Sequence, residues 1–500
     1  MTTYTSLEDF DTAYKTVNAT FKSGTTKDLK WRKWQLKQLW WLMEDNEKRI
    51  LAALKKDLNR NDFESIFTDV VGVKTDILHH ISSLEKWTAD QPIDAGFIFG
   101  TLGKSKIRRE PLGVTLIIGA WNFPIMLTLQ PVIAAIAAGC AIVIKPSELA
   151  VATQDLLMEL IPRYMDPSAI VAVSAGPAEM GPILDRKYDH IFYTGGSKVA
   201  RIIAAAAAKH LTPTVLELGG QGPAIVTKSA NVDLAAKKIA WAKYLNAGQI
   251  CLSVNHVFAD PAIADELVER LSHWFDVCQN GGSKPTAAAS NMVTIINERN
   301  FDRLAGLLSQ TEGKTTYGGD LDRATKKFSP TVVANVTLDD SLMSEELFGP
   351  ICPIIKADYK QAIKNIGDLP HPLAIYIFSS KQSEIDEILG GTNSGGCSIN
   401  DVIIHAGTPN APFGGVGESG HGYYHGTYGI DAFSHIRTVV EPPSFLHKIT
   451  GFLYPPFDVK HASKIAVKNK LGFKRGETLQ DQKIKVGFLW RLQQLIPFAG

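Results

Sequence analysis

The chain has 500 residues, a length that predicts roughly three folding units. Apolar residues make up 45% of the chain, which is enough for a large core. Lysine and arginine number 52 against 51 aspartate and glutamate, and this near balance excludes a broad basic surface for nucleic acid. The five cysteines include no C-x-x-C pair, which excludes a disulfide scaffold and a cysteine-rich zinc module and favours a reducing compartment.

Two features of the sequence bear on location. Residues 1–10 contain neither a basic patch nor an apolar run, so no secretory signal is predicted. The longest apolar stretch, Val132–Ile144, is too short to span a bilayer. The sequence therefore predicts an intracellular, cytoplasmic protein.

The C-terminal 50 residues differ in charge from the rest. Gly451–Gly500 holds 9 Lys and Arg against 3 Asp and Glu, and its segment Phe488–Phe498 is apolar and aromatic. Two interpretations are open. The basic tail, residues 446–500, either packs on the body or contacts a membrane, with cations on anionic lipid and aromatic side chains in the headgroup region. Only one amphipathic stretch supports the membrane contact, so packing is the simpler interpretation.

The first hundred residues are predicted to be mostly helical. Within residues 27–90, Leu36, Leu39 and Met43 recur at three- to four-residue spacing, which indicates an amphipathic helix. The glycine-containing, apolar segment Gly96–Arg109 is predicted to be an extended hairpin.

From residue 113 onward, short apolar strands alternate with helices. A first series of predicted strands comprises Val114–Ile118, Ala141–Ile144, Ile170–Val173, His190–Tyr193 and Thr214–Glu217. A second series comprises Ala224–Val226, His256–Phe258, Thr331–Val333, Ile351–Ile355 and Ala374–Phe378. Helices are predicted near 128–138, 202–209, 234–245, 262–278, 297–310, 359–367 and 382–389. This alternation is typical of parallel, doubly wound α/β sheets, which bind ligands at the carboxyl ends of their strands.

Three polar segments follow strands of the first series. Asn122, in Gly119-Ala-Trp-Asn-Phe-Pro, is either a turn residue or an amide donor for an oxyanion. Lys145 and Glu148 belong either to a polar loop or to a site for ribose hydroxyls, where a carboxylate would repel a 2′-phosphate. Gly195-Gly-Ser197 opens a helix, and small residues there let backbone amides approach a phosphate.

One cysteine stands apart from the others. Four are predicted to be small core residues: Cys140, Cys278, Cys352 and Cys397. Cys251 instead follows a Gly-Gln loop beyond a predicted helix, which is a poor place for a core residue. Glu217, in Glu-Leu-Gly-Gly, lies about 30 residues earlier at the end of a strand. This pair is the part of the sequence that points most clearly to chemistry.

Six segments in order resemble the aldehyde dehydrogenase superfamily over about residues 10–445. They are W-N-F-P, K-P-S-E, E-L-G-G, G-Q-I-C, Glu345-Glu346-Leu-Phe348-Gly-Pro350 and Pro412-Phe-Gly-Gly-Val-Gly. The short N-terminus, together with segments 211–213, 400–402, 424–426 and 433–435, is similar to class 3, the branch that contains fatty aldehyde dehydrogenases.

The resemblance implies a fold of three parts. Residues 1–94 and 113–219 would form an NAD(P)-binding domain with a doubly wound parallel sheet, and residues 220–412 an α/β catalytic domain. Residues 95–112 and 413–445 would form a small β oligomerisation arm. A homodimer and a mechanism without a metal are implied as well.

The resemblance also implies roles in a reaction. Cys251 would attack the aldehyde carbonyl as a thiolate, and the Asn122 amide and the Cys251 N–H would stabilise the oxyanion. Hydride would pass to NAD or NADP and leave a thioester, which water activated by Glu217 would hydrolyse. The implied cofactor-binding residues are Trp121, Lys145, Glu148, Gly195, Gly196, Ser197, Glu346 and Phe348.

The helix opening departs from the family's usual G-S-T-x-x-G, since it reads Gly195-Gly-Ser-Lys198-Val-Ala200. Lys198 adds a cation near the expected phosphates, which leaves the choice between NAD and NADP open. Glu148 favours NAD.

Apolar residues near Cys251 predict the substrate class. The expected pocket residues, unless they are simply core, are Phe123, Trp241, Leu245, Ile250 and Leu252. Apolar walls favour medium- or long-chain, aromatic, or isoprenoid and apocarotenoid aldehydes.

Two alternatives compete with this interpretation. A coenzyme A-acylating relative would also use a cysteine, but such enzymes typically lack the water-activating carboxylate, so Glu217 speaks against it. A catalytically silent binding protein on the same fold could lose Cys251 and Glu217 freely, and both are present.

Overall fold

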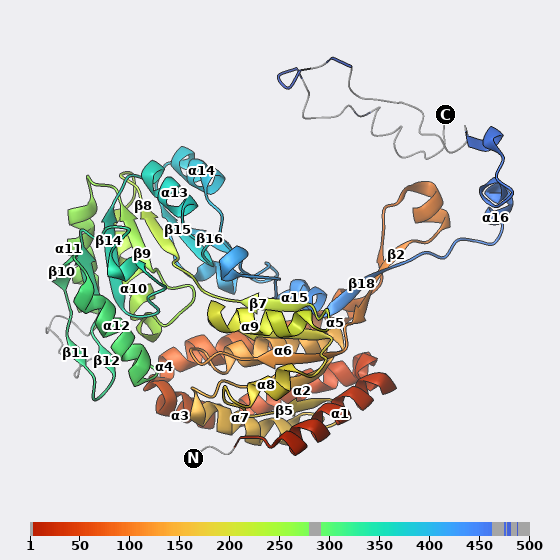
Figure 1. Cartoon of the computed structure of the whole chain (residues 1–500), viewed down its shortest axis with the longest axis horizontal. Coiled ribbons are helices and arrows are strands. Elements are labelled where there is room, and N and C mark those ends of the chain that lie inside the picture. The colour runs from red at the N-terminus through yellow and green to blue at the C-terminus, as the bar shows by residue number, and fades with distance from the viewer. Residues whose placement is uncertain (1–3, 280–291, 463–474, 477, 482–487, 489–500) are drawn as a thin grey trace. The chain divides into compact units, whose positions relative to one another are not determined.

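The computed structural model describes residues 4–279, 292–462, 475–476, 478–481 and 488. The chain divides into two compact units. The first comprises Met1–Trp87 and Pro111–Ser434, and the second Thr88–Glu110 and His435–Gly500. Both large sheets lie in the first unit (Figure 1), so this division leaves the predicted boundary between cofactor and catalytic domains at 219/220 a prediction.

The described part of the first unit contains a six-stranded sheet in the order β17-β7-β6-β3-β4-β5. Its strands are β3 (Val114–Ile118), β4 (Ala141–Lys145), β5 (Ile170–Ala172), β6 (His190–Thr194), β7 (Thr214–Glu217) and β17 (Gly420–His421). All neighbours pair in parallel except β17, which is antiparallel to β7. Because the strand order reverses direction between β3 and β6, this point is where a doubly wound sheet offers a ligand crevice.

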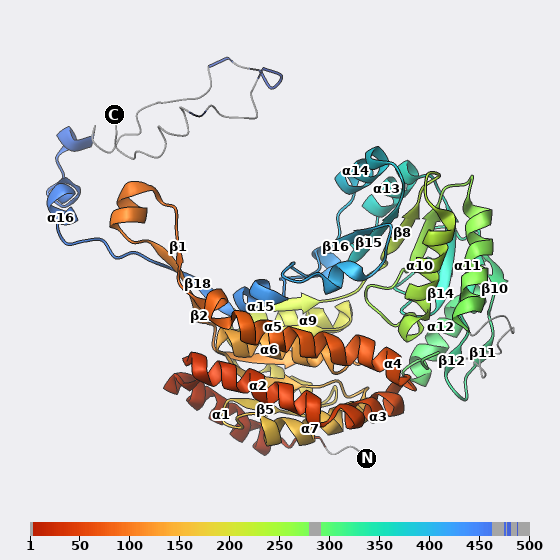
Figure 2. The same ribbon diagram turned by 180° about the vertical axis from the view of Figure 1, so that it is seen from behind.

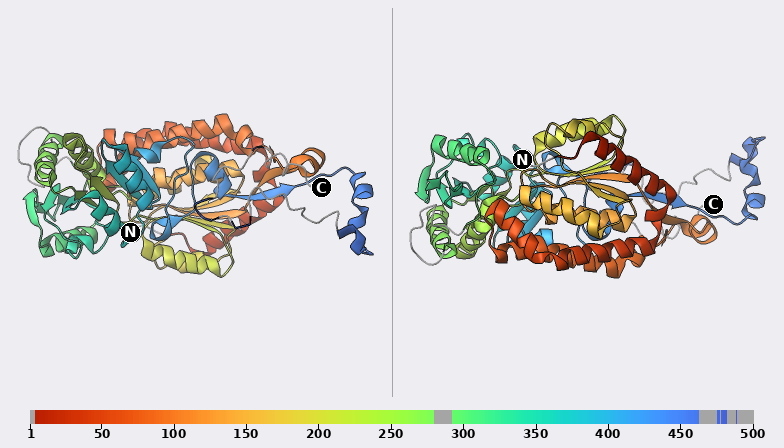
Figure 3. Two further views of the ribbon diagram at one scale, coloured as in Figure 1. Left: turned by 90° about the horizontal axis from the view of Figure 1, so that it is seen from above. Right: turned by 90° about the horizontal axis from the view of Figure 1, so that it is seen from below.

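Alternate residues of these strands face two helical layers. Ile117, Ile142 and Ile144 pack in one core, and Leu116 and Val143 pack in the other. The surrounding helices are α1 (Leu7–Ser23), α2 (Leu29–Asp45), α3 (Glu47–Leu58), α4 (Asp62–Ser65), α5 (Val71–Thr88), α6 (Met126–Ala138), α7 (Val151–Tyr164), α8 (Met180–Leu184) and α9 (Ser197–Ala208). Figures 2 and 3 show helices on both faces of this sheet.

The second sheet of the first unit has the order β10-β13-β14-β9-β8-β15-β16. Its strands are β8 (Pro223–Val226), β9 (His256–Ala259), β10 (Lys314–Tyr317), β13 (Thr331–Ala334), β14 (Ile351–Lys356), β15 (Ala374–Phe378) and β16 (Gly396–Ile399). Only the edge strand β10 runs antiparallel to its neighbour. The helices packed around it are α10 (Val232–Tyr244), α11 (Ala264–Cys278), α12 (Glu298–Gln310), α13 (Tyr359–Gly367) and α14 (Gln382–Gly391).

Every strand predicted in the two series is present, with bounds that differ by at most one residue. Elements that the sequence did not predict include the small strands β11 (Leu321–Asp322) and β12 (Lys327–Phe328), the edge strands β10, β16 and β17, and helices α1 and α15 (Gly426–Ala432).

The helix α6 illustrates how local sequence sets the bounds that matter for the site. Asp69 accepts hydrogen bonds from the N–H groups of Ile125 and Met126, which satisfies amides at the start of the helix. At the other end, Gly139 adopts a left-handed conformation with φ 95° and closes the helix. Asp69 thus fixes where the segment containing Asn122 turns into α6.

The second unit contains the three-stranded sheet β1-β2-β18, formed by β1 (Gln91–Pro92), β2 (Lys106–Pro111) and β18 (Ser434–Val439). The prediction of an extended hairpin over Gly96–Arg109 is wrong for Phe97–Leu102, which forms a short π-helix. Ser105 causes this turn to close, because both its N–H and its hydroxyl donate to the carbonyl of Phe99.

The described C-terminal residues form turns and short helices of three or four residues, including α16 (Leu446–Ile449). None of the helices among the described residues is long and apolar enough to cross a membrane. Of the predicted interfacial segment Phe488–Phe498, all but Phe488 lies outside the described residues.

Candidate active site

The polar segments predicted from the sequence follow neighbouring strands of the first sheet. Asn122 follows β3, Lys145 ends β4, Gly195 follows β6 and Glu217 ends β7. Since these strands are parallel neighbours in the order β7-β6-β3-β4, their carboxyl ends share one edge of the sheet. The structure therefore brings these four segments together at the sheet edge that includes the switch point.

Cys251 lies on the loop between α10 and β9, and its side chain is half-buried. Burial raises the pKa of its thiol to about 12, and the nearby carboxylates of Glu346 and Glu217 act in the same direction. The backbone N–H groups of Cys251 and Leu252 act against this rise, because they hydrogen-bond to the sulfur. The sulfur is thus within electrostatic reach of two carboxylates and accepts from two backbone amides.

The loop that carries Cys251 has an unusual backbone. Asn246, Ala247 and Gly248 adopt left-handed conformations in succession, with φ of 52°, 53° and 68°. Alanine rarely adopts this conformation, so surrounding contacts must hold it. A Cβ at Gly248 would lie 2.4 Å from the carbonyl oxygen of Gly349, so the two backbones touch directly.

Glu217 is 3% exposed, and neither carboxylate oxygen has a hydrogen-bond partner among the described residues. Burial alone raises its pKa well above the usual value for glutamate. A buried carboxylate without a partner is costly in a resting structure. Its oxygens are therefore available to a water molecule or a ligand.

Asn122 is 4% exposed, and its side-chain amide donates to the carbonyl of Gln249 at 3.1 Å. That carbonyl belongs to the loop that carries Cys251, two residues before the cysteine. The Asn122 amide thus points at the loop that carries the thiol, and its second N–H is not used by this bond.

Glu346 and Phe348 lie on a loop that reaches the same region. A Cβ at Gly219 would lie 2.3 Å from Glu346 Oε1, so only glycine leaves room for this carboxylate beside the end of β7. Burial raises the pKa of Glu346 to about 7, while the N–H of Gly220 and the cations Arg303 and Lys243 act to lower it. The Phe348 ring meets Trp121 edge to face, with centroids 5.3 Å apart.

The loop of Glu346 is held by side chains that sequence reasoning did not identify. Arg303 donates to the carbonyl oxygens of Glu346 and Leu347 at 3.2 and 2.6 Å. Lys243, buried on α10, donates to the carbonyl of Gly349 at 3.2 Å. No pattern in the sequence marks these cations, because their partners are backbone atoms of distant segments.

The remaining predicted cofactor residues suit a phosphate and a ribose. Helix α9 begins after Gly196 without a side-chain cap, and a Cβ at Gly196 would meet nothing within 4 Å. Uncapped first-turn amides with open space beside them form a site for an anion. Lys145 and Glu148 form an ion pair with each other where β4 ends. These features fit a dinucleotide at this edge of the sheet.

The predicted substrate residues fall into two groups. Phe123, Ile250 and Leu252 are at most 6% exposed and belong to an apolar core that Cys251 packs against. Trp241 and Leu245 instead line a cavity of about 380 Å³. The other lining residues are Asn61, Phe63, Glu64, Phe67 and Tyr244.

The aromatic residues of this cavity were missed from the sequence. Phe63 and Phe67 are 81% and 52% exposed, and their rings stack with centroids 6.5 Å apart. Phe67 also meets Trp241 edge to face at 6.5 Å. Their spacing of four residues on a polar segment was the available signal, since exposed aromatic pairs often mark a binding site.

The other four cysteines occupy ordinary positions. Cys140 and Cys352 are buried, and Cys278 and Cys397 are half-buried. The part of the chain that the structure describes holds no group of three His, Cys, Asp or Glu side chains suited to a metal ion.

Comparison with known proteins identifies the family. The model of the aldehyde dehydrogenase family matches residues 2–439. The chain belongs to the aldehyde dehydrogenase family. As a member of it, the protein is an NAD(P)-dependent enzyme that oxidises aldehydes to carboxylic acids.

Its relatives include class 3 enzymes of this family. The chain is 41% identical over 457 residues to the beta-apo-4'-carotenal oxygenase of Neurospora crassa, covering 91% of this chain and 85% of that protein. It is 39% identical over 440 residues to the dimeric NADP-preferring aldehyde dehydrogenase of Canis lupus familiaris, covering 88% and 96%. The structure of an aldehyde dehydrogenase, AldH, from Staphylococcus aureus aligns with a TM-score of 0.83 at 32% identity, covering 89% and 99%.

Proposed function

We propose that this aldehyde dehydrogenase acts on medium- and long-chain apolar aldehydes, including apocarotenoid ones. The observation that carries the proposal is the cavity lined by Phe63, Phe67, Trp241, Tyr244 and Leu245, on and beside the helix that leads to Cys251. Apolar and aromatic walls favour an apolar chain over a short polar one. The name of the Neurospora crassa relative, a carotenal oxygenase, is in keeping with this class.

Within this proposal Cys251 is the nucleophile. Its sulfur, as the thiolate, forms a bond to the aldehyde carbonyl carbon, and the carbonyl electron pair moves to oxygen. The Asn122 amide and the Cys251 N–H donate to that oxyanion. A bound nicotinamide dinucleotide supplies the two-electron oxidation that leaves a thioester on Cys251.

Glu217 completes the cycle in this proposal. Its unpartnered carboxylate takes a proton from water, and the hydroxide attacks the thioester carbonyl. The carbon–sulfur bond breaks, the carboxylic acid leaves and the thiol is restored. Burial supports the assignment, because a raised pKa makes Glu217 a stronger base than an exposed glutamate.

We assign the dinucleotide to the sheet edge described above. The first-turn amides of α9, from Ser197 onward, hold a phosphate, and Lys145 with Glu148 holds the adenosine ribose. Glu346, Phe348 and Trp121 hold the nicotinamide end. Both NAD and NADP are accepted in this proposal, since Glu148 is already paired with Lys145 and Lys198 adds a cation in the first turn of α9.

Two features of the second unit extend the proposal. The arm sheet β1-β2-β18 would join two copies in a dimer. The name of the dog relative describes that enzyme as dimeric. The tail from residue 446 would contact anionic membrane, because it is basic and its described residues include the exposed side chains Tyr454, Phe457 and Val459.

A panel of straight-chain aldehydes tests the substrate class. Burial of each additional methylene should raise kcat/KM roughly fourfold until the cavity is full, which corresponds to about 0.8 kcal/mol. Replacing Phe67 by alanine should flatten this dependence and leave short aldehydes unaffected. Equal kcat/KM for acetaldehyde and decanal in the natural enzyme would refute the assignment.

The same assay tests the chemistry. Cys251→Ala should abolish formation of reduced nicotinamide, whereas Glu217→Gln should give one turnover and then hydrolyse the thioester at least about 100-fold more slowly. The product should be the free acid. Acyl-coenzyme A formed in the presence of coenzyme A would favour the acylating alternative.

A further inference from the structure

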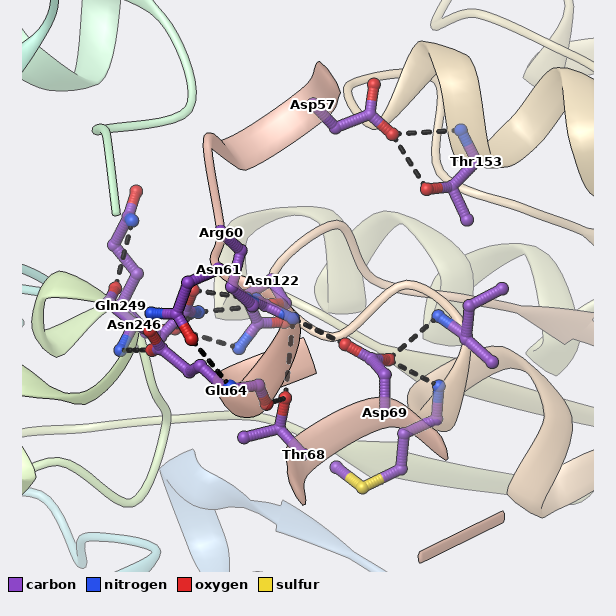
Figure 4. A network of polar contacts seen from close by, with 12 residues as sticks. Asp57, Arg60, Asn61, Glu64, Thr68, Asp69, Asn122, Thr153, Asn246 and Gln249 are labelled. Carbon is purple, nitrogen blue, oxygen red and sulfur yellow. Dashed lines mark hydrogen bonds and ion pairs between the residues drawn. The ribbon is translucent and has the colours of Figure 1, made fainter. Parts of the chain in front are cut away.

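A buried polar network joins the segment of Asn122 to the loop of Cys251 (Figure 4). We call it the Arg60 network, and its members are Arg60, Glu64, Asp69, Asn122, Asn246 and Gln249. All six side chains are at most 7% exposed. They come from the segment after α3, from the segment between β3 and α6, and from the loop that carries Cys251. The network therefore connects three regions that are far apart in sequence.

Arg60 lies at the centre of the network and is fully buried. One terminal nitrogen donates to the backbone carbonyl of Asn122 and, at 2.7 Å, to Oδ1 of Asn246. The other terminal nitrogen forms an ion pair with Asp69. The guanidinium also lies 5.0 Å from the ring centroid of Phe123, the residue after Asn122. A single side chain therefore holds three backbone segments.

Asp69 connects Arg60 to the far end of the segment that contains Asn122. Its second oxygen accepts the N–H groups of Ile125 and Met126 at 3.0 and 2.8 Å. The ion pair with Arg60 therefore ties the start of α6 to the carbonyl of Asn122. The short segment between them is fixed at both ends, which limits the directions in which the Asn122 amide can point.

Asn246 connects Arg60 to the loop that carries Cys251. Its amide donates to the carbonyls of Asn122 and Gln249 at 3.1 and 3.0 Å, and its backbone N–H donates to Glu64. The Gln249 side chain donates to the carbonyl of Asn246 at 3.0 Å. These bonds enclose Ala247, whose left-handed backbone needs such support.

We infer that Arg60 is a positioning residue that sets the Asn122 amide and the Cys251 loop at the separation the reaction requires. The inference rests on the proposed roles of Cys251 and Asn122. Arg60 acts through these residues and belongs to neither the cavity nor the cofactor residues. Lysine cannot replace it, because a single ammonium group lacks the planar fork that reaches acceptors on three segments at once.

The test compares Arg60→Lys with Arg32→Lys as a matched control. Arg32 is also a buried arginine that donates to backbone carbonyls, those of Thr26, Lys27 and Ala137, but it lies outside the site. Each full-length variant is loaded with NADP and mixed rapidly with decanal, and the first-turnover rate of nicotinamide reduction is measured. Arg60→Lys should slow this rate at least about tenfold with the dinucleotide Kd unchanged, whereas Arg32→Lys should not slow it.

A double-mutant cycle separates positioning from general destabilisation. Removing the oxyanion donor with Asn122→Ala should slow the first turnover about 100-fold or more. If Arg60 acts through Asn122, adding Arg60→Lys should cause little further loss. A rate for Arg60→Lys within twofold of the natural enzyme, or additive losses in the double variant, would overturn the inference.

A second variant decides the question if Arg60→Lys does not fold. Asn246→Gly keeps a residue that adopts the left-handed conformation easily and removes the three side-chain hydrogen bonds to Arg60, Asn122 and Gln249. The same loss of rate and the same non-additivity with Asn122→Ala are therefore expected. A failure of the proposed function would give a different result from a failure of the inference about Arg60. In that case Cys251→Ala would retain nicotinamide reduction, whatever the Arg60 variants do.

Discussion

Among single residues, Glu346 makes the unfolding free energy of the protein depend on pH. Its pKa is about 7 in the folded protein, above the ordinary value of 4.5, chiefly because the carboxyl group is buried. Between those two values the folded state binds more protons than the unfolded state. Stability from this group is therefore present at low pH and is lost as pH rises from 4.5 through 7.

Glu346→Gln removes this dependence. The variant should match the natural protein near pH 4.5 and exceed it by about 1–3 kcal/mol in unfolding free energy at pH 8. Denaturant unfolding of the dinucleotide-free protein across that range measures the difference. If the difference in unfolding free energy between the variant and the natural protein stays constant with pH, Glu346 is not the group that causes the pH dependence.

Among the elements, α9 leaves its first-turn amides without a side-chain cap. Gly196→Asp would supply a cap and add a negative charge to the expected phosphate site. We expect helix stability to change by only a few tenths of a kcal/mol, and dinucleotide Kd to rise at least about tenfold because like charges repel.

Helix α1 provides the control for this change. Ser6 already caps it, so Ser6→Asp adds the same charge at a helix start away from the predicted cofactor residues. Titration of each variant with NADP, followed by fluorescence, compares the two. Equal weakening by both changes would indicate a general effect of charge and contradict the assignment of the phosphate to α9.

The elements also show what sequence can and cannot predict. The buried parallel strands were predictable because they are short apolar runs that end in glycine, proline or polar residues, and the candidate site residues followed from motifs at those ends. Edge strands such as β10, with mostly exposed residues, carry no such signal. Arg60 and Asp69 could not be predicted, since their role depends on bonds to backbone atoms far away in sequence.

For the whole molecule, the proposed dimer depends on the arm sheet. Ile436 on β18 is 45% exposed, which is unusual for an isoleucine on a strand unless another surface covers it. Ile436→Asp should shift the mass in solution toward that of a single chain, as measured by light scattering. Leu321→Asp, at a similarly exposed residue of β11, should leave the mass unchanged.

The direct contact between Gly248 and Gly349 has a consequence for the catalytic cycle. With no side chain between them, the loop that bears the thiol and the loop that bears Glu346 cannot shift independently. In the proposed mechanism, ordering one loop restricts the other, and thermodynamic linkage makes that influence reciprocal. We therefore expect the dinucleotide Kd to differ between an enzyme that carries an acyl group on Cys251 and the resting enzyme, and this difference would influence the order in which the two products leave.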